Sequence, residues 1–347
     1  MKKVLYLTVK VVPYRTRFFN EWSKHCDLTV AYEMSSAGAR NREWTMSEEV
    51  KHKALFLDER KGWASYWAMF KLLRKDWDAI IVGCCNIGME RFAVLFLRLM
   101  HIPFILNFDG ESFFEGNSFK AKLKRWFVKG AKLYVVAGEQ SKLNLEKFIK
   151  APVIPYYFSP LFRKEISSHS EVRLRRESFV LVVGQYCYAK GLDIMLKVAL
   201  KDLSIHYKFI GMGVRQDLFM KEQEVPDVSN IEFIPFLQKK DLEEEYKRCS
   251  LFVLPSRQEC WGLVINEAAS FGTPIVSTSG SGAAVEFLQN AYPQYLALPG
   301  DEESLYRIIK DCLSQPTDVY RAYLMDKAKK YTIEEMVESH NRIFNIL

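Results

Sequence analysis

The sequence predicts an α/β protein with two Rossmann-like domains, each built on a doubly wound parallel sheet. Its 347 residues exceed the roughly 250–300 at which a single hydrophobic core stops growing, so two domains are expected. Short apolar strands alternate with helical patterns through both halves of the chain, as in parallel sheets covered on both faces. Between the halves, residues 163–178 (RKEISSHSEVRLRRES) are polar and aperiodic, which is typical of an interdomain connection.

The first half, residues 1–162, is predicted to form the N-terminal domain. Apolar runs of four to six residues indicate strands that are buried on both faces. These runs cover residues 4–9, 28–31, 54–57, 79–82, 104–107 and 133–137. Helical patterns lie between them, for example at residues 64–75 and 88–100.

The second half, residues 179–330, repeats this order and is predicted to form the C-terminal domain. Its predicted strands cover residues 179–183, 207–210, 231–234, 251–254, 274–277 and 295–297. A last segment, residues 331–347, is predicted to be helical from residue 333 to residue 346.

Composition and charge limit the class of protein. With 49% hydrophobic and 26% charged residues, the composition is that of a globular protein and not of a disordered one. No apolar run approaches the ~20 residues that span a bilayer, and the N-terminus lacks the cleavage site of a signal peptide. A soluble or peripheral protein is therefore expected, cytoplasmic or on the inner face of the cell membrane.

Net charge and cysteine content indicate the partners and the compartment. A net charge of +7 and a pI near 8.9 favour an anionic partner: a nucleotide, a phospholipid or a nucleic acid. The seven cysteines have no metal-like spacing, so we expect a reducing compartment, no zinc site, and Cys84 and Cys85 buried as small apolar residues.

The most informative segment is residues 251–287, in which Glu259 and Glu267 stand eight positions apart between two apolar runs. A helix that starts near Gly262 would offer free N–H groups and a positive dipole end beside Glu259, which suits an anionic phosphate. Glu259 would lie in the loop before this helix and Glu267 more than a turn inside it. In a chain with 42 acidic residues, two glutamates alone are usually solvated. Here a strand, the Pro255-Ser256 pair, a helix, a turn and a second strand follow one another, and this order favours a binding site.

This segment resembles the donor-sugar site of retaining glycosyltransferases with the GT-B fold, whose signature is Glu-x7-Glu. The variant is family 4-like and similar to bacterial surface-polysaccharide transferases. The resemblance implies an acceptor-binding N-terminal domain and a nucleotide-sugar-binding C-terminal domain that face each other across a cleft, with the last helix crossing back. It also implies that Glu267 binds the ribose hydroxyls and Glu259 the transferred sugar, while backbone N–H groups around Gly262 and Leu263 hold the β-phosphate.

Residues 182–196 (VVGQYCYAKGLDIML) match a second segment of this family. Lys190 stands at the position of the phosphate-binding lysine and Gly184 at a turn where the backbone approaches the ligand. Gln185 replaces the usual arginine, and a neutral amide shifts the stabilisation of the diphosphate toward Lys190 and the helix. Taken alone, Lys190 would be interpreted as a solvated loop lysine.

Two further segments align with the nucleotide-binding region. Gly211, in FIGMGVRQDL, resembles the Gly-x-Gly turn after the second strand, although a glycine pair can also serve only a tight turn. In IEFIPFLQKKDL, Phe236 and Leu237 align with the backbone that holds the base, and Pro235 removes one N–H there. An aromatic residue in such a place is more often part of the core.

The first half carries fewer recognisable features. Relatives often have a glycine-rich loop where this chain has Pro13-Tyr14 followed by Arg15 and Arg17, which are candidates to contact an acceptor phosphate or the donor diphosphate. Arg17 is equally well interpreted as a surface arginine. Asp109 follows a predicted strand where relatives place a polar residue beside the transferred sugar, but the Asp-Gly pair also fits a turn.

The segment from Phe119 to Lys132 (FKAKLKRWFVKGAK) has six basic residues and no acidic one. As a helix it would place an apolar stripe beside a basic rim, which is the pattern of a helix that lies on an anionic membrane surface. The other interpretation is a domain helix with a solvated basic face.

We therefore predict a retaining glycosyltransferase that moves a sugar from a UDP- or GDP-linked donor to a hydroxyl of a glycan or lipid-linked acceptor, in bacterial surface polysaccharide synthesis. Glu259, Lys190 and Asp109 are the candidate catalytic residues. No cofactor and no metal is expected, since Lys190 and the helix can take the place of a cation. The alternatives are a catalytically silent partner subunit that binds nucleotide or anionic lipid, and a nucleotide-sugar epimerase. A nucleic-acid partner is not expected.

Overall fold

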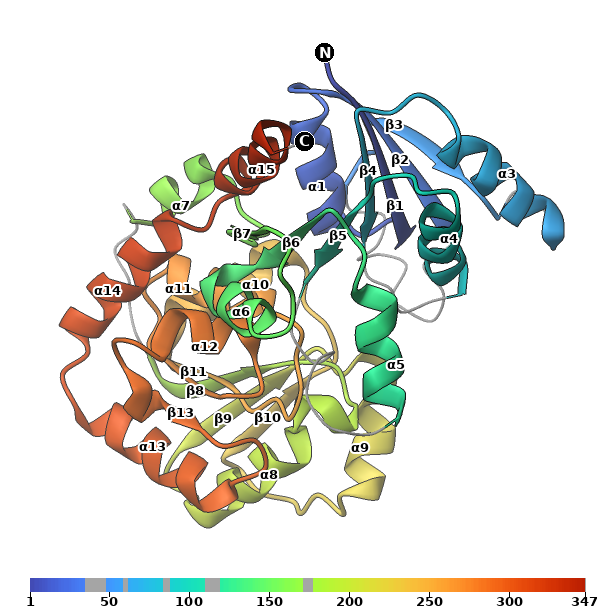
Figure 1. Cartoon of the computed structure of the whole chain (residues 1–347). Helices are drawn as coiled ribbons and strands as arrows, with labels where there is room; N and C mark the ends of the chain where they lie inside the picture. The colour runs from blue at the N-terminus through green and yellow to red at the C-terminus, as the bar shows by residue number, and fades with distance from the viewer. Residues whose placement is uncertain (35–47, 59–61, 84–87, 110–118, 171–176, 347) are drawn as a thin grey trace. The chain divides into compact units, whose positions relative to one another are not determined.

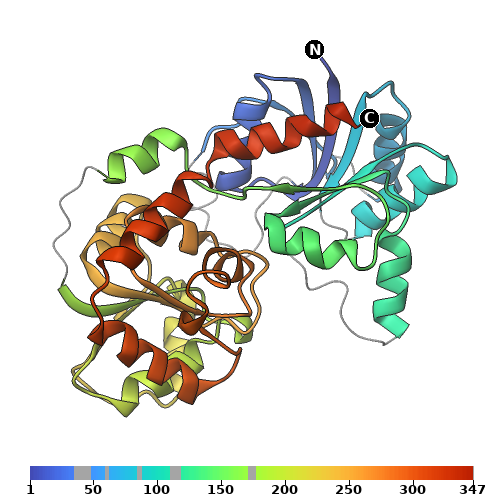
Figure 2. The same cartoon turned by 60° about the vertical axis from the view of Figure 1, so that its left-hand side comes forward.

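The computed structural model describes residues 1–34, 48–58, 62–83, 88–109, 119–170 and 177–346. The chain divides into two compact units (Figures 1 and 2). Unit 1 comprises Met1–Pro160 and Ile333–Leu347, and unit 2 comprises Leu161–Thr332. Each unit has its own parallel sheet with helices on its faces, so the predicted α/β class is confirmed.

The sheet of unit 1 has seven strands in the order β3-β2-β1-β4-β5-β6-β7, and all described neighbours pair in parallel. Its central strands are almost fully buried, as near-continuous apolar runs require. The strands are β1 (Lys3–Lys10), β2 (Asp27–Met34), β3 (Lys53–Phe56), β4 (Ala79–Gly83), β5 (Ile105–Phe108), β6 (Leu133–Ala137) and β7 (Val153–Tyr156).

Strand β7 was not among the sequence predictions, and Pro155 explains why. Proline cannot donate to a strand ladder, so a proline within an apolar run argues against a central strand. In the structure, β7 is the last strand of the sheet and pairs with β6 alone, with Pro155 opposite Val136. An edge strand tolerates the missing N–H, which sequence alone cannot reveal because edge position is a property of the assembled sheet.

The helices of unit 1 lie on both faces of this sheet. In Figure 1, α1 and α15 lie on one side of it, and α3 and α4 lie on the other. Helix α15 packs on α1, where the indole Nε1 of Trp22 donates to Asn341 Oδ1 at 2.9 Å. The helices are α1 (Pro13–Trp22), α3 (Trp63–Leu73), α4 (Gly88–Leu99), α5 (Phe119–Val128), α6 (Gly138–Glu146) and α15 (Ile333–Asn341).

The sheet of unit 2 has six parallel strands in the order β10-β9-β8-β11-β12-β13. All six strands that the sequence predicts in this half are present. They are β8 (Glu177–Val183), β9 (His206–Ile210), β10 (Ile231–Ile234), β11 (Cys249–Leu254), β12 (Ile275–Thr278) and β13 (Leu296–Ala297). The helices are α7 (Arg163–Ser170), α8 (Leu192–Lys201), α9 (Gln216–Glu222), α10 (Lys239–Arg248), α11 (Leu263–Ser270), α12 (Gly282–Leu288), α13 (Glu302–Ser314) and α14 (Asp318–Lys329).

Helix α7 corrects the prediction for residues 163–178, of which the first eight are helical instead of forming an irregular connection. The Glu165 carboxylate accepts from the Phe162 N–H at 2.7 Å and closes the first turn, as in half of a capping box. Ile166 is buried, and the His169 ring stacks on Phe271 with centroids 3.8 Å apart. Tertiary contacts therefore form this helix, whose own sequence has little apolar periodicity.

Over the described ranges, no helix has both the length and the apolar character needed to traverse a bilayer. The prediction for Cys84 and Cys85 falls outside the described residues.

Candidate functional site

The sheet of unit 2 reverses its strand order beside β8. From β8 the chain adds β9 and β10 on one side, then returns to place β11 and β12 on the other. In doubly wound sheets, ligands bind at the carboxyl ends of the strands at such a reversal. Lys190 follows β8 and Glu259 follows β11, so the two residues come from the two strands that meet at the reversal.

The structure joins these two residues directly. Lys190 Nζ donates to Glu259 Oε2 in an ion pair, and the two side chains are 28% and 18% exposed. Partial exposure leaves both groups accessible to a ligand, while the pair keeps each charge oriented. An ammonium group suits a phosphate and a carboxylate suits a hydroxyl donor, so the pair combines the two kinds of group that a phosphorylated sugar requires.

Helix α11 starts at Leu263 with Gly262 as its N-cap residue, so the predicted helix start is confirmed, with Glu259 before the helix and Glu267 inside it. The first N–H groups of an α-helix have no acceptor within the helix and carry partial positive charge. Gly262 has φ +99°, and a Cβ there would lie 2.8 Å from Ser281 Oγ. Only glycine fits this backbone, which places the helix end close to Glu259.

The loop of Glu259 is held on both sides by backbone hydrogen bonds. Its N–H donates to Gly280 O at 2.8 Å, and the N–H of Arg257 donates to Ala189 O at 2.8 Å. The second bond ties the loop after β11 to the turn that carries Lys190. Main-chain hydrogen bonds therefore help to fix the positions of the two loops that carry the charged side chains.

A second ion pair, which the sequence analysis did not predict, joins the same two loops. The Arg257 guanidinium binds both carboxylate oxygens of Asp193 at 2.7 and 2.6 Å and also donates to Tyr188 O at 2.9 Å. Burial by itself would raise the pKa of Asp193, but the Arg257 hydrogen bonds and charge lower it below the usual value. The available signal was an arginine just after Pro255-Ser256 and an aspartate just after Lys190-Gly191.

Glu267 lies on α11, about one turn after the first helical residue, Leu263. Its Oε2 accepts from the Tyr246 hydroxyl at 3.1 Å. Burial raises the pKa of Tyr246, and the neighbouring Glu267 carboxylate raises it further, so this phenol stays protonated and donates. The carboxylate keeps acceptor capacity for other donors, since an ionised carboxylate has about four acceptor positions.

The other predicted donor-site residues follow neighbouring strands at the same edge of the sheet. Gly184, after β8, donates its N–H to Ile210 O at 2.9 Å, and Gly211, after β9, donates to Ile234 O at 3.1 Å. Gly211 has φ +101°, as a tight turn requires. Gln185 is exposed, and Phe236 and Leu237 are half-buried in the loop after β10.

Arg15 and Asp109 lie in unit 1, where they form an ion pair. Arg15 is buried, and the Tyr156 hydroxyl donates to Asp109 Oδ1 at 2.6 Å. Burial alone would lower the pKa of Arg15, but the Asp109 carboxylate raises it. The two residues were predicted for separate roles, and the structure instead makes them partners.

Arg17 is also engaged within unit 1. Its guanidinium donates to Pro160 O at 2.5 Å and lies 3.4 Å from the Glu48 carboxylate. The turn predicted at Asp109 continues into Gly110, which is outside the described residues. For the residues that the structure describes, no group of three or more His, Cys, Asp or Glu side chains is arranged to hold a metal ion.

The chain is similar to known proteins in both sequence and fold. Residues 164–332 match the family model described as glycosyl transferases group 1. An uncharacterized glycosyltransferase of Methanocaldococcus jannaschii is 28% identical over 158 residues, which are 45% of this chain and 43% of that protein. The sulfoquinovosyl transferase of Arabidopsis thaliana is 29% identical over 46% of this chain and 30% of its own length. The O-antigen chain mannosyltransferase C of Escherichia coli is 24% identical over 49% of this chain and 47% of its own length.

The alignment thus spans less than half the length of these curated relatives. Solved structures match over nearly the whole chain. Sucrose-phosphate synthase from Thermosynechococcus elongatus superposes with a TM-score of 0.72 at 13% identity, over 99% of this chain and 98% of that one. The α,α-trehalose 6-phosphate synthase from Burkholderia multivorans gives 0.71 at 11% identity, over 99% and 98%. At such identities the likeness shows the fold, which is GT-B.

Proposed function

Residues 164–332 of this chain belong to the group 1 glycosyltransferases and the chain has the GT-B fold, and from this premise we propose that it is a retaining transferase. It moves a sugar from a nucleotide-sugar, UDP- or GDP-linked, to a hydroxyl of an acceptor. The observation that carries the proposal is the Lys190–Glu259 pair at the strand-order reversal, beside the N-terminus of α11.

Each group has a role that its chemistry suits. Negative charge grows on the leaving diphosphate during transfer, and the Lys190 ammonium together with the first N–H groups of α11 stabilises it. Glu259 orients the transferred sugar by accepting from its hydroxyls, and Glu267 accepts from the ribose hydroxyls. Gly184 and Gly211 let the backbone approach the nucleotide, and Phe236 and Leu237 flank the base.

Transfer with retention follows from positioning and charge stabilisation more than from a protein nucleophile. The acceptor hydroxyl attacks on the same face that the diphosphate leaves, and the departing phosphate helps to remove the hydroxyl proton. No side chain is assigned as the base. Lys190 and the helix N-terminus supply the positive charge in this scheme.

Unit 1 is the proposed acceptor unit. Asp109, partly exposed and oriented by Arg15 and Tyr156, is its candidate contact to substrate. The acceptor is a glycan or lipid-linked glycan of bacterial surface polysaccharide synthesis, which is supported by the similarity to an O-antigen chain mannosyltransferase. The basic helix α5, on which Lys122 is exposed and which Lys129 follows, would approach an anionic membrane surface.

The first experiment is thermal unfolding of the purified protein with UDP, GDP, ADP, CMP and their common sugar conjugates. A rise in Tm with one nucleotide, lost in Glu267→Ala, is expected, because a ligand stabilises the folded state that binds it. The responding nucleotide identifies the base, and sugar release or transfer with a hydroxyl acceptor then separates a transferase from an epimerase. A nucleotide response without any turnover would support the silent partner subunit instead.

A further inference from the structure

Helices α3, α4 and α5 lie side by side on one face of the sheet of unit 1. Their outward surface exposes large apolar side chains that a solvated helix face seldom carries. Trp63 and Trp67 of α3 are 82% and 63% exposed, and Trp126 of α5 is 51% exposed. Within the described part of the chain, these are the exposed tryptophans. The apolar residues of this surface, here called the α3–α5 surface, are Trp63, Trp67, Phe92, Leu99, Met100 and Trp126.

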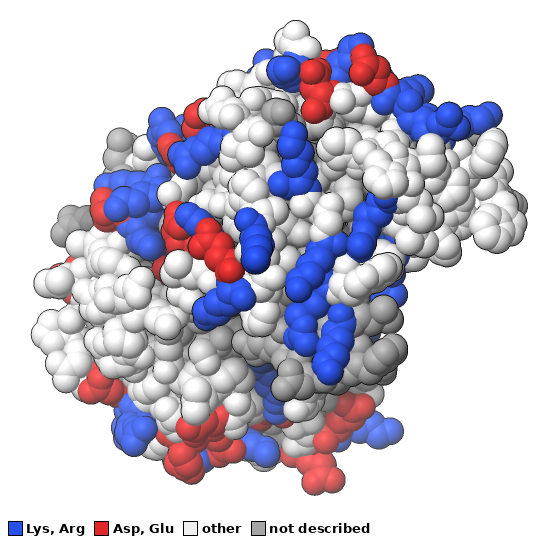
Figure 3. Space-filling view, viewed as in Figure 1, with Lys and Arg blue, Asp and Glu red and all other residues white. Residues whose placement is uncertain are grey.

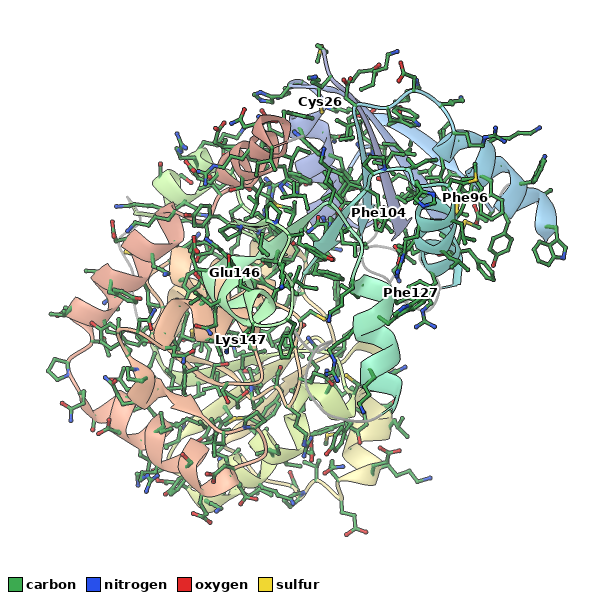
Figure 4. All side chains as sticks on the ribbon, viewed as in Figure 1. Cys26, Phe96, Phe104, Phe127, Glu146 and Lys147 are labelled. Carbon is green, nitrogen blue, oxygen red and sulfur yellow. The ribbon has the colours of Figure 1, made fainter. Side chains whose placement is uncertain are left out.

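Side-chain contacts at this surface join α3 to α4 and α4 to α5. The Trp63 ring centroid lies 5.7 Å from that of Tyr66, which lies 5.2 Å from Phe92 on α4. Farther along α4, the Arg98 guanidinium lies 4.4 Å from the ring centroid of Trp126 on α5. Figure 4 labels Phe96 on α4 and Phe127 on α5, two partly buried rings that pack against the core beneath this surface.

Along α3, the exposed face changes from aromatic to basic. Trp63, Trp67, Lys71 and Arg74 are separated by four, four and three positions, so they follow one another on a single face of the helix. The Lys71 ammonium lies 5.9 Å from the Trp67 ring centroid. On this face of α3, two tryptophans are therefore followed directly by two positively charged side chains.

The charge of these helices has one sign at the surface. The sequences of α3, α4 and α5 contain a single acidic residue, Glu90, and it is buried. Exposed basic residues include Lys71, Arg91 and Lys122. Figure 3 shows an uncharged area at the right, over α3 and α4, that borders a run of Lys and Arg toward α5. A partner for this surface must accept tryptophan rings and also carry negative charge.

An anionic lipid bilayer meets both requirements. Tryptophan favours the boundary between headgroups and acyl chains, where its ring is apolar and its N–H stays hydrated. Lysine and arginine near that boundary are attracted to anionic headgroups. A second copy of this chain would instead bring two positively charged surfaces together, which like-charge repulsion opposes.

We infer that the α3–α5 surface docks on an anionic lipid bilayer, with Trp63 and Trp67 at the headgroup boundary and the basic residues against the headgroups. The assignment goes beyond the basic helix α5, because its apolar contacts come from α3 and α4. It does not depend on the donor site, since all of its residues lie in unit 1.

The test is sedimentation of the full chain with vesicles of phosphatidylcholine alone and with vesicles that also contain phosphatidylglycerol. Binding is expected only to the anionic vesicles, with a blue shift of tryptophan emission. Trp63→Ser with Trp67→Ser is expected to lower the partition coefficient about tenfold or more. Lys71→Glu with Arg74→Glu is expected to lower it by a similar factor and to weaken its salt dependence, since Arg91 and Lys122 remain.

Matched controls come from exposed residues of unit 2. Leu203→Ser with Leu298→Ser removes exposed apolar side chains, and Arg307→Glu with Lys329→Glu makes the same change of charge elsewhere. Both should bind vesicles nearly as the parent chain does. The parent chain failing to bind anionic vesicles, or control and test variants losing binding equally, would overturn the inference. Concentration-dependent dimerisation that Trp63→Ser and Trp67→Ser abolish would overturn it in favour of a second copy.

Discussion

Lys190 and Glu259 are 69 positions apart in the chain and form one ion pair at the end of the sheet of unit 2. Neither residue type is informative alone, because lysine and glutamate are the commonest occupants of solvated surfaces. What indicates a binding site is the helix N-terminus beside the pair, together with the main-chain hydrogen bonds that hold both loops. The ion pair also orients each of the two side chains.

Replacing Lys190 is expected to impair chemistry more than folding. Lys190→Ala should lower kcat for sugar transfer about a hundredfold or more, since the proposed role of this charge is to stabilise the leaving diphosphate. Steady-state kinetics with the nucleotide-sugar found by thermal shift measures the loss. Lys197→Ala, an exposed lysine of the adjoining helix α8, is the matched control and should retain activity. Activity of Lys190→Ala close to that of the parent chain would contradict the proposed role.

His340 makes the stability of unit 1 sensitive to acid. Burial lowers its pKa from 6.5 to about 3 in the folded chain. Between these two pH values, the unfolded chain therefore binds a proton at His340 that the folded chain does not bind. The contribution of neutral His340 to the free energy of unfolding is complete above pH 6.5 and is lost as the pH falls toward 3. Tm measured from pH 7 to pH 4.5 should decline, and His340→Phe should flatten that decline. His25→Phe, at an exposed histidine, should leave the slope unchanged.

At the scale of single elements, the turn between β8 and α8 holds Lys190 in place. Gly191 has φ +66°, and a Cβ on it would lie 2.1 Å from Pro255 O, in the loop that leads to Glu259. The two loops thus approach each other at a point where no side chain fits. The Arg257–Asp193 ion pair braces the same junction from its other side.

Gly191→Ala tests this close approach. The added methyl group should push the loops apart, lower Tm by several degrees and weaken the nucleotide-induced rise in Tm. Gly62→Ala is the control, because Gly62 has a similar φ of +59° but no atom within 4 Å of the added Cβ. An equal effect of both substitutions would assign the loss to backbone strain alone, and the proposed packing of the two loops would be wrong.

At the scale of the whole molecule, unit 1 is built from both ends of the chain. Helix α15 supplies Met336 and His340 to its core, and Asn341 binds Trp22 across 319 positions. Unit 1 therefore cannot complete its core until the chain of unit 2 has been made. Contacts of such sequence separation cost loop-closure entropy, which slows folding.

Met336→Ala is expected to destabilise unit 1 by about 2–5 kcal/mol, because it leaves a cavity at a fully buried position. Calorimetry should show the transition of unit 1 moving to lower temperature while that of unit 2 stays in place. Glu338→Ala, at an exposed position on the same helix, should change neither transition. If Met336→Ala lowered both transitions together, the two units would not unfold independently.

Much of this molecule could be predicted from local sequence. Apolar runs identified twelve strands, because strands buried on both faces must be apolar at nearly every position. The start of α11 directly after Gly262 and the loop position of Glu259 followed from the order of strand, turn and helix. These features depend on neighbours a few residues away, so their physical causes are present in the sequence itself.

The remaining features depend on partners that are far apart in the chain. Strand β7 is possible because Pro155 lies at the edge of an assembled sheet, and α7 forms because it packs on other elements of unit 2. Arg15 and Asp109 were assigned separately, and only the fold made them a pair. The α3–α5 surface likewise exists only when three helices lie side by side. Local patterns thus determined the elements and the candidate donor-site motif, whereas tertiary contact decided which charges are paired and which apolar side chains stay exposed.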